Sequence, residues 1–243
     1  MTIIYRISEG GYSKQKIKGV SNFPCLINAW NVFKGYTWLI IVDGITEQKS
    51  LLYDPFVVID TLRREEPNVS VQHVTVGHGA GTFNLALDFA LTLPDNETVY
   101  FLESDYIHLP NAGTIIEEGI GLGADYVAIY DHPDKYLSPE QGGNPEVEGG
   151  GELTRVLLSK SSHWKITNST TMTFAAKVKT IREDEEILRR FTSGTYPRDY
   201  DMFLALREKG RVLISSIPGV CTHGEERWQS PLTNWEEIVS NYP

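Results

Sequence analysis

The chain has 243 residues, of which 41% are hydrophobic and 22% are charged, and its formal net charge is −10 at pH 7. A chain of this length and composition can bury the core of one large α/β domain. The acidic balance argues against a nucleic-acid partner, because binding nucleic acid needs a basic face. No apolar run approaches the roughly 20 residues that cross a bilayer, and we identify no signal peptide, so we expect a cytoplasmic protein without a membrane span.

The first half of the sequence alternates short apolar runs with longer runs that have helical spacing. In chain order these patterns predict a strand at 3–7, a helix at 22–33, a strand at 38–42, a helix at 53–64, a strand at 69–76, a glycine-rich turn at 77–81, a helix at 82–93, a strand at 98–102, a helix at 112–122 and a strand at 126–130. Such alternation predicts a doubly wound, mostly parallel sheet flanked by helices.

The second half begins with a change of composition. Residues 131–151 are rich in glycine, proline and acids and show no periodicity, which is typical of a lid or a mobile loop. The remaining patterns predict strands at 155–158 and 169–177, helices at 182–191 and 199–209, and a strand at 211–217. Cys25 and Cys221 lie far apart among apolar neighbours, so we expect buried free thiols, which suits a reducing compartment.

Polar and glycine residues follow three of the predicted strands directly. Asp43 ends one strand, the turn 77–81 follows the next, and Glu103-Ser104-Asp105 ends the strand at 98–102. Ligands of doubly wound sheets bind outside the carboxyl ends of the strands. Two acids so close together at a strand end can hold a hard divalent cation, Mn²⁺ or Mg²⁺, and leave coordination sites for phosphate oxygens. Acids at strand ends are also common without any ligand.

The segment from Val99 to Pro110 resembles the centre of family 2 glycosyltransferases of the GT-A fold. In that family a hydrophobic strand ends in an Asp-x-Asp motif, of which the last acid is the most direct metal ligand. The resemblance implies that Asp105 takes this role, while Glu103 replaces the usual first Asp. It further implies a GT-A fold with a small second sheet near the acceptor side.

Other segments extend the resemblance on the donor side. Asp43 matches the acid that contacts the nucleoside, and the segment from Gly79 to Asn84 matches the glycine-containing start of a helix. Such a helix start offers free N–H groups to an anion or a ribose. The nucleotide-sugar site implied in this way consists of Arg6, Ser8, Asp43, Gly79, Asn84, Glu103, Ser104, Asp105 and Arg227.

The acceptor side resembles the family in its helix at 199–209. This helix matches the family's Glu-Asp-x-x-Leu helix, whose second acid is the general base, and that position is Asp199. Arg198 replaces the first acid, so Asp201 is the reserve candidate. Either acid can instead be an ordinary partner of the helix dipole.

Two further groups complete the predicted site. His223 resembles the histidine that completes metal or diphosphate binding, and Arg227 can neutralise a diphosphate. Trp164, Asn168 and Ser169 lie in the part of the chain that faces the acceptor in the family, although an edge strand with Thr-rich β propensity is the more ordinary explanation.

The resemblance implies a metal-dependent transfer, with inversion, from a UDP- or GDP-linked sugar to a carbohydrate or lipid-linked acceptor. We expect one domain over 1–243, with a nucleotide-binding half at 1–130 and an acceptor-binding half at 152–230. Two alternatives stay open. One is a sugar nucleotidyltransferase, for which the segment from Ser8 to Lys14 is a poor phosphate loop, and the other is a non-catalytic nucleotide-sugar or carbohydrate-binding protein, which Arg198 favours.

Overall fold

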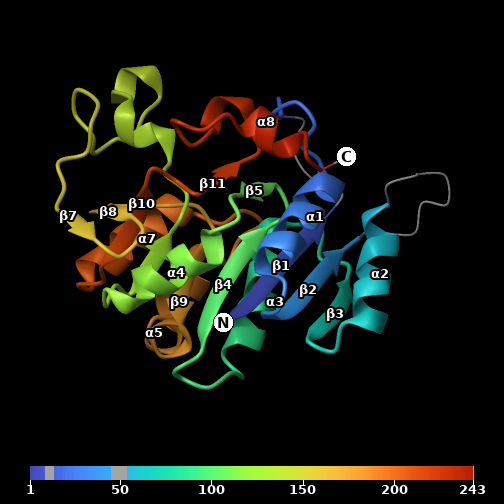
Figure 1. Ribbon diagram of the computed structural model, residues 1–243. Helices are drawn as coiled ribbons and strands as arrows, with labels where there is room; N and C mark the ends of the chain where they lie inside the picture. The colour runs from blue at the N-terminus through green and yellow to red at the C-terminus, as the bar shows by residue number, and fades with distance from the viewer. Residues whose placement is uncertain (9–13, 45–53, 243) are drawn as a thin grey trace.

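A large mixed sheet forms the centre of the molecule in the computed structural model, which describes residues 1–8, 14–44 and 54–242 (Figure 1). Among these residues, nine strands form the sheet in the order β3-β2-β1-β4-β9-β6-β10-β8-β7. All of its strands run in one direction except β8 and β9, which are antiparallel to their neighbours. The predicted mostly parallel sheet is confirmed.

The first half of the chain follows the expected alternation closely. Its elements are β1 (Thr2–Ser8), α1 (Asn22–Phe33), β2 (Thr37–Asp43), α2 (Pro55–Glu65), β3 (Val69–Val74), α3 (Gly79–Ala90), β4 (Thr98–Glu103), β5 (Tyr106–His108), α4 (Ala112–Gly121) and β6 (Tyr126–Ala128). The predicted turn at 77–81 is partly helical, because the His78 side chain accepts a hydrogen bond from the Gly81 N–H at 3.0 Å and so caps α3. Residues 9–13 of the segment that was compared with a phosphate loop, and the first residue of the helix predicted at 53–64, lie outside the described residues.

The second half departs more from expectation. Its elements are β7 (Val156–Leu158), β8 (His163–Ile166), β9 (Phe174–Lys177), α5 (Val178–Glu183), α6 (Glu185–Phe191), α7 (Asp199–Glu208), β10 (Leu213–Ile217), β11 (Cys221–His223) and α8 (Trp235–Val239). The helix predicted at 182–191 is wrong as a single element, because a new helix begins after Asp184. The buried Asp184 carboxylate binds Lys209 and Arg211, so its position is fixed by distant residues.

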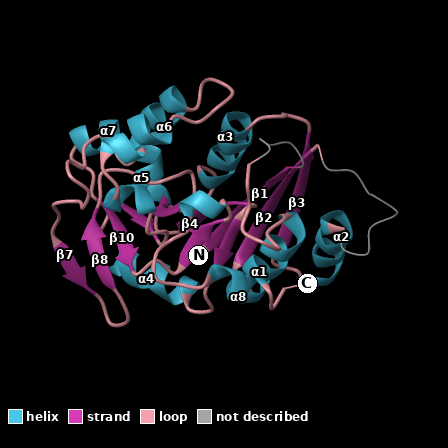
Figure 2. Ribbon diagram, turned by 90° about the horizontal axis from the view of Figure 1, so that it is seen from above, coloured by secondary structure: helices cyan, strands magenta, loops and turns pink. Residues whose placement is uncertain are grey.

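Helices cover both faces of the sheet and make two hydrophobic layers (Figure 2). One face packs under α1, α2 and α4, around side chains such as Phe33 and Tyr100. The opposite face packs under α3, α5, α6 and α7, around Phe83, Phe101 and Phe174. Strands covered on both faces read as unbroken apolar runs, which is why β2 and β4 were predictable.

A second, two-stranded sheet pairs β5 with β11, and its register places Tyr106 opposite His223. The strand predicted at 155–158 is β7, and of the strand predicted at 169–177 only β9 at Phe174–Lys177 forms; both belong to the main sheet. The segment 131–151, predicted as a loop, holds two short 3₁₀ turns, Pro133–Tyr136 and Pro139–Gln141, and buries the Lys135 side chain.

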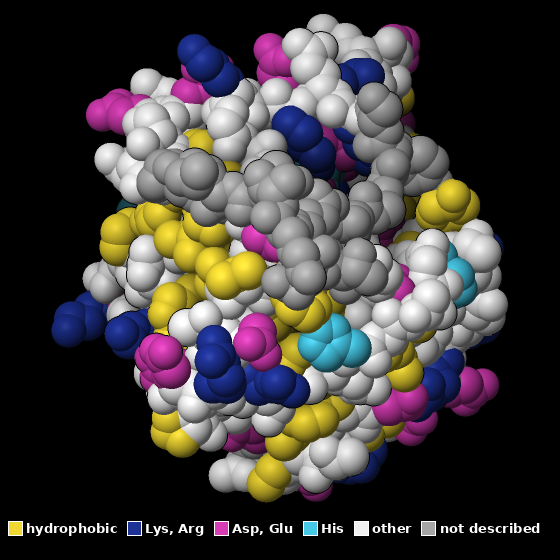
Figure 3. Space-filling model, turned by 90° about the vertical axis from the view of Figure 1, so that its right-hand side faces the viewer, with side chains coloured by type: hydrophobic (Ala, Val, Ile, Leu, Met, Phe, Trp, Pro, Cys, Tyr) yellow, Lys and Arg dark blue, Asp and Glu magenta, His cyan; other side chains and the backbone are white. Residues whose placement is uncertain are grey.

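The surface and the cysteines agree with the composition. Cys25 and Cys221 are both free and buried, as predicted. In the described part of the chain, no helix is both long and apolar enough to span a bilayer. On the face seen in Figure 3, the described acidic and basic side chains are interspersed and form no continuous basic stripe.

Candidate active site

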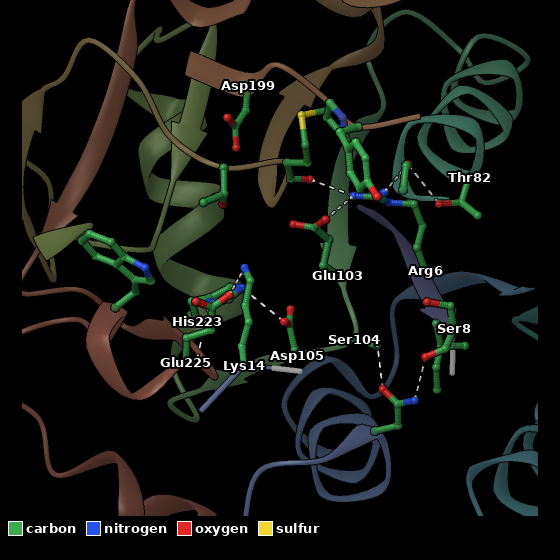
Figure 4. Close-up of a pocket in the computed structure, with 18 of the residues that line it drawn as sticks. Arg6, Ser8, Lys14, Thr82, Glu103, Ser104, Asp105, Asp199, His223 and Glu225 are labelled. Carbon is green, nitrogen blue, oxygen red and sulfur yellow. Dashed lines mark hydrogen bonds and ion pairs between the residues drawn. The ribbon is translucent and has the colours of Figure 1, made fainter. Parts of the chain in front are cut away.

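A cleft of about 900 Å³ opens at the carboxyl ends of β1 and β4, where the strand order predicted a ligand. Its walls come from β1, β4, the start of α3, the start of α7 and the segment after β11. From the predicted site it brings together Arg6, Ser8, Gly79, Glu103, Ser104, Asp105, Asp199 and His223. Figure 4 shows Asp199 on the opposite side of the cleft from Asp105.

Asp105 is the centre of one end of this cleft. Its Oδ2 atom lies 2.7 Å from Nζ of Lys16 and 3.1 Å from Nε2 of His223. Burial alone would raise the pKa of the Asp105 carboxyl, but His223 and Lys16 outweigh burial and hold that pKa well below its usual range. Burial likewise opposes the charge on His223, yet Asp105 raises the pKa of its imidazole above the ordinary value.

Three backbone segments hold this end of the cleft in place. The Gly224 N–H donates to the Asp105 carbonyl at 2.7 Å, and the Ile17 N–H donates to the Gly224 carbonyl at 2.9 Å. A Cβ at position 224 would lie only 2.7 Å from the Asp105 carbonyl oxygen, so the close approach requires glycine. The backbones that carry Lys16, His223 and Asp105 are therefore fixed side by side.

Glu103 and Arg6 form a second charged pair deeper in the cleft. Nη2 of Arg6 lies 3.3 Å from Oε1 of Glu103, and the same guanidinium donates to the carbonyls of Gly79 and Met172. The Arg6 side chain is buried, whereas Glu103 is about one-third exposed to the cleft. This pairing leaves Glu103 as a neutralised wall residue rather than a second free ligand beside Asp105.

Ser104 and Ser8 are linked through one asparagine on α1. The Ser104 hydroxyl donates to Oδ1 of Asn22 at 3.1 Å, and Nδ2 of Asn22 donates to the Ser8 carbonyl at 2.8 Å (Figure 4). The asparagine thereby joins the ends of β1 and β4 across the floor of the cleft.

Asp199 lines the other end of the cleft at the first position of α7. Burial raises the pKa of its carboxyl to about 6, although one oxygen accepts a hydrogen bond from the Tyr200 N–H at 2.8 Å. A carboxyl with this pKa is ionised at neutral pH and can accept a proton. Asp201, the reserve candidate, lies outside the cleft, is half-exposed and pairs with Arg198 at 3.6 Å.

An aromatic wall borders the cleft. The His132 ring lies 5.3 Å from the Trp228 ring and 5.0 Å from the Tyr130 ring, and the Tyr130 hydroxyl donates to the Trp228 carbonyl at 2.6 Å. All three side chains line the cleft. Flat rings with polar edges suit a sugar, whose ring faces are apolar and whose hydroxyls need hydrogen bonds.

The Asp105 end has two side chains that fit a divalent cation. Two ligands that bind one ion at right angles, at about 2.1 Å each, lie about 3 Å apart, close to the observed Asp105–His223 separation of 3.1 Å. The Glu225 carboxylate lies 3.6 Å from Nδ1 of His223, too far for a hydrogen bond, and the Glu225 backbone N–H donates to the same nitrogen at 3.3 Å. Among the described residues no cluster of three or more such ligands occurs, so phosphate oxygens and water would complete the shell.

Three residues of the predicted donor site do not line the cleft. Both Asp43 oxygens accept backbone N–H groups of Val76 and Gly77 at 2.7–3.1 Å, so this carboxylate holds the turn before α3. Asn84 is bonded to Ala80 and Thr192, and Arg227 lies over the Trp228 ring and donates to the Gln141 carbonyl. In the structure these three side chains hold neighbouring backbone, and their donor contacts stay predictions.

The helix start at α3 also offers fewer free N–H groups than expected. The Ala80 N–H donates to the Thr195 carbonyl at 3.3 Å, and the Gly81 N–H donates to His78. Gly79 itself lines the cleft.

The predicted acceptor residues lie away from the cleft as well. Trp164 on β8 is fully buried, and its indole N–H donates to the Ser159 hydroxyl at 3.0 Å. Asn168 and Ser169 are buried in a polar network with Asn144 and Lys135. This network anchors the segment 131–151 to the rest of the chain.

Several cleft residues were not part of the predicted site. They are Lys14, Lys16, Asn22, His78, Tyr130, His132, Thr171, Tyr196, Glu225 and Trp228. Lys16 is 89 positions before Asp105 in the sequence, and no local pattern connects the two. Of this group, His78 lies in the predicted turn 77–81 and Lys14 ends the segment that was compared with a phosphate loop, so these two residues had a sequence signal.

No protein-family model and no curated protein matches the chain. Solved structures do match in fold. GalNAc-T7, whose structure contains UDP, GalNAc and Mn²⁺, matches with a TM-score of 0.58 and 12% identity over 94% of this chain and 44% of its own. The chain has a GT-A fold.

Two other solved structures match the chain in fold. A putative glucose-1-phosphate thymidylyltransferase from Bacillus anthracis, in complex with sucrose, matches with a TM-score of 0.54 and 16% identity, over 99% of this chain and 94% of its own. S. aureus TarS matches with a TM-score of 0.50 and 15% identity, over 88% of this chain and 56% of its own. The chain thus spans about half the length of the GalNAc-T7 and TarS chains.

Proposed function

We propose that this chain is a glycosyltransferase that moves a sugar from a nucleoside-diphosphate sugar, UDP- or GDP-linked, to an acceptor hydroxyl. The observation that carries the proposal is the arrangement of two carboxylates across one cleft. Asp105 is kept ionised beside His223, and Asp199 faces it with a pKa raised to about 6. One end suits the diphosphate and the other suits proton removal.

In this proposal the Asp105 end receives the donor. Asp105 and His223 would hold Mn²⁺ or Mg²⁺, and a cation held there would supply positive charge for the departing diphosphate. Glu225 holds the His223 ring through its backbone N–H, which donates to Nδ1 at 3.3 Å. Arg6 neutralises Glu103, so that this wall of the cleft does not repel the donor phosphates.

The Asp199 end receives the acceptor. The ionised carboxylate accepts the proton of an acceptor hydroxyl that lies behind the anomeric carbon, and the acceptor oxygen then bonds to that carbon as the diphosphate leaves. Attack from the side opposite the leaving group inverts the anomeric configuration. Trp228 and His132 provide flat rings against which a carbohydrate, free or lipid-linked, can pack.

The proposal divides the single domain at the cleft. Residues 1–130 contribute Asp105 and the donor wall, and residues 152–230 contribute Asp199, His223 and Trp228. The segment 131–151 lies between the two halves, and His132 at its start lines the cleft.

A thermal-shift screen tests the donor part of the proposal. UDP, GDP and their sugars, each with and without Mn²⁺, should raise the melting temperature of the protein when they bind its folded state. The expected result is stabilisation by one nucleoside diphosphate and its sugar, larger with Mn²⁺. If none of these ligands shifts the melting temperature, the proposed donor class is wrong.

Turnover then separates the proposal from its alternatives. The sugar identified by the screen is incubated with candidate acceptors, and release of the nucleoside diphosphate is measured. Release of pyrophosphate from a nucleoside triphosphate and a sugar 1-phosphate would instead indicate a nucleotidyltransferase. Tight donor binding without any transfer or hydrolysis would favour a binding protein.

A further inference from the structure

Lys16 occupies the carboxylate oxygen that the proposed function assigns to the cation. Its Nζ atom lies 2.7 Å from Oδ2 of Asp105, the same atom that His223 contacts at 3.1 Å. A divalent cation bound to this oxygen would lie within a few ångströms of the ammonium group, and the two positive charges would repel each other. The ion pair and the metal site therefore compete for Asp105.

The backbone of Lys16 cannot easily withdraw to relieve this competition. Lys16 pairs with Glu225 in an antiparallel bridge, and the neighbouring hydrogen bonds run from Ile17 to Gly224 and from Glu226 to Gln15. The segment that carries Lys16 is thus joined to the segment that carries His223. Only the lysine side chain, which is one-third exposed and has a flexible four-carbon stem, is free to move.

Both carboxylates at this end of the cleft have cationic partners before any ligand binds. Lys16 pairs with Asp105, and Lys14 pairs with Glu225. A nucleoside diphosphate would add negative charge, which attracts the Lys16 ammonium as a phosphate partner. Once the ammonium moves to a phosphate oxygen, the Asp105 oxygen is exposed to a cation, whose charge in turn offsets the phosphates.

We propose that Lys16 blocks the metal-binding carboxylate until a diphosphate draws its ammonium away, so that the divalent cation and the nucleotide bind cooperatively. This inference rests on the proposed function and adds that the nucleotide must displace Lys16 before the cation can bind Asp105. The exchange breaks the Lys16–Asp105 ion pair, forms a Lys16–phosphate pair and forms a cation–Asp105 contact. Because coupling between two binding sites is reciprocal, Mn²⁺ must raise nucleotide affinity by the same factor as the nucleotide raises Mn²⁺ affinity.

The test is a Mn²⁺ titration followed by the electron paramagnetic resonance signal of free Mn²⁺, without and with saturating UDP or GDP. For the wild-type protein we expect weak Mn²⁺ binding alone and at least a tenfold gain in affinity with the nucleotide that binds. Lys16→Met keeps the stem but removes the charge. This variant should bind Mn²⁺ alone at least tenfold more tightly than the wild type, and its gain with the nucleotide should shrink.

Two matched variants act as controls. Lys18 lies on the same segment but is exposed and does not line the cleft, so Lys18→Met should behave like the wild type. Lys16→Arg keeps a cation that can pair with Asp105 and should keep the coupling. Thermal unfolding of each variant checks that it folds.

The outcomes separate this inference from the proposed function. If the wild type binds nucleotide with Mn²⁺ but Lys16→Met binds Mn²⁺ no more tightly than Lys18→Met, the blocking role of Lys16 is overturned and the proposed function stands. If the wild type binds no nucleoside diphosphate with or without Mn²⁺, both fail. Tighter Mn²⁺ binding by Lys16→Met alone, with Lys16→Arg unchanged, supports the inference.

Discussion

Asp105 and Asp199 line the same cleft, yet their surroundings affect their carboxyl groups in opposite directions. Asp105 follows β4 and is held by Lys16 and His223, which keep its pKa below the usual range. Asp199 begins α7, and burial raises its pKa to about 6. Both are carboxylates at neutral pH, but only Asp199 is poised to accept a proton there.

The proposed function needs one acid that binds a cation and one that accepts a proton, and two acids with the same pKa could not do both. A carboxylate that stays ionised across the physiological range holds a cation without competing for protons. A partly desolvated carboxylate near its pKa can take a proton and later release it. In the proposed function the cleft therefore has a charge-holding end at Asp105 and a proton-handling end at Asp199, and Asp105→Asn and Asp199→Asn each alter one of these ends.

The largest expected effect comes from Asp199→Asn. The amide keeps the shape of the side chain but cannot accept the acceptor proton, so the turnover number should fall about 10³-fold. Donor affinity, measured by calorimetry, should stay within twofold of the wild type because Asp105 and His223 are untouched. Turnover near the wild-type rate would show that another group is the base.

The next largest effect should follow Asp105→Asn. Even outer partners of metal ligands cost 10- to 100-fold in metal affinity when they are changed, so we expect loss of a direct ligand to weaken Mn²⁺-dependent nucleotide binding roughly 100-fold. Calorimetric titration with the nucleotide, in the presence of Mn²⁺, measures this affinity. Unchanged nucleotide affinity in this variant would show that Asp105 does not bind the cation.

The proton-handling end should also set the acid limb of the pH profile. Because the raised pKa of Asp199 is about 6, the base is ionised above that pH and protonated below it. The value of kcat/KM should fall about tenfold per pH unit below roughly pH 6. A limb that persists with the same midpoint in Asp199→Asn, measured on its residual activity, would assign the ionisation to a different group.

The smallest effect is expected for Asp201→Asn, the matched control two residues from Asp199. Asp201 lies outside the cleft and only pairs with Arg198 on the surface, where such pairs contribute little. Its turnover number should stay within about twofold of the wild type. A fall in turnover number as large as that of Asp199→Asn would contradict the assignment of Asp199 alone as the base.

The parallel half of the fold could be predicted because its patterns are local. The helix α1 has the bounds expected from its apolar spacing, and the buried runs of β2 and β4 read directly as strands. The short strands β5 and β11 could not be predicted, since three residues carry no periodicity and the pairing joins positions more than 100 residues apart. The strand β8 was read only as a possible edge strand.

Site residues could be predicted where the order of motifs along the sequence matched the order in the family. Residues that only tertiary contacts bring to the site could not be predicted. The order of Asp105, Asp199 and His223 followed the resemblance, and the structure gathers all three around one cleft. An aspartate and a tryptophan both suit a binding site, so residue type alone favoured Asp43 and Trp164. In the structure, backbone N–H groups hold the Asp43 carboxylate. Trp164 is fully buried. Lys16 reaches Asp105 only through the folded backbone, so sequence alone gave no signal for it.

The central claim is that the donor diphosphate binds at the Asp105 end and not at the Asp199 end. One calorimetric titration tests it most directly: UDP and GDP, each with Mn²⁺, into the wild type, Asp105→Asn and Asp199→Asn. The account predicts that the wild type and Asp199→Asn bind the same nucleotide with similar affinity, while Asp105→Asn loses most of that affinity. Equal binding by Asp105→Asn, or loss of binding in Asp199→Asn alone, would contradict it.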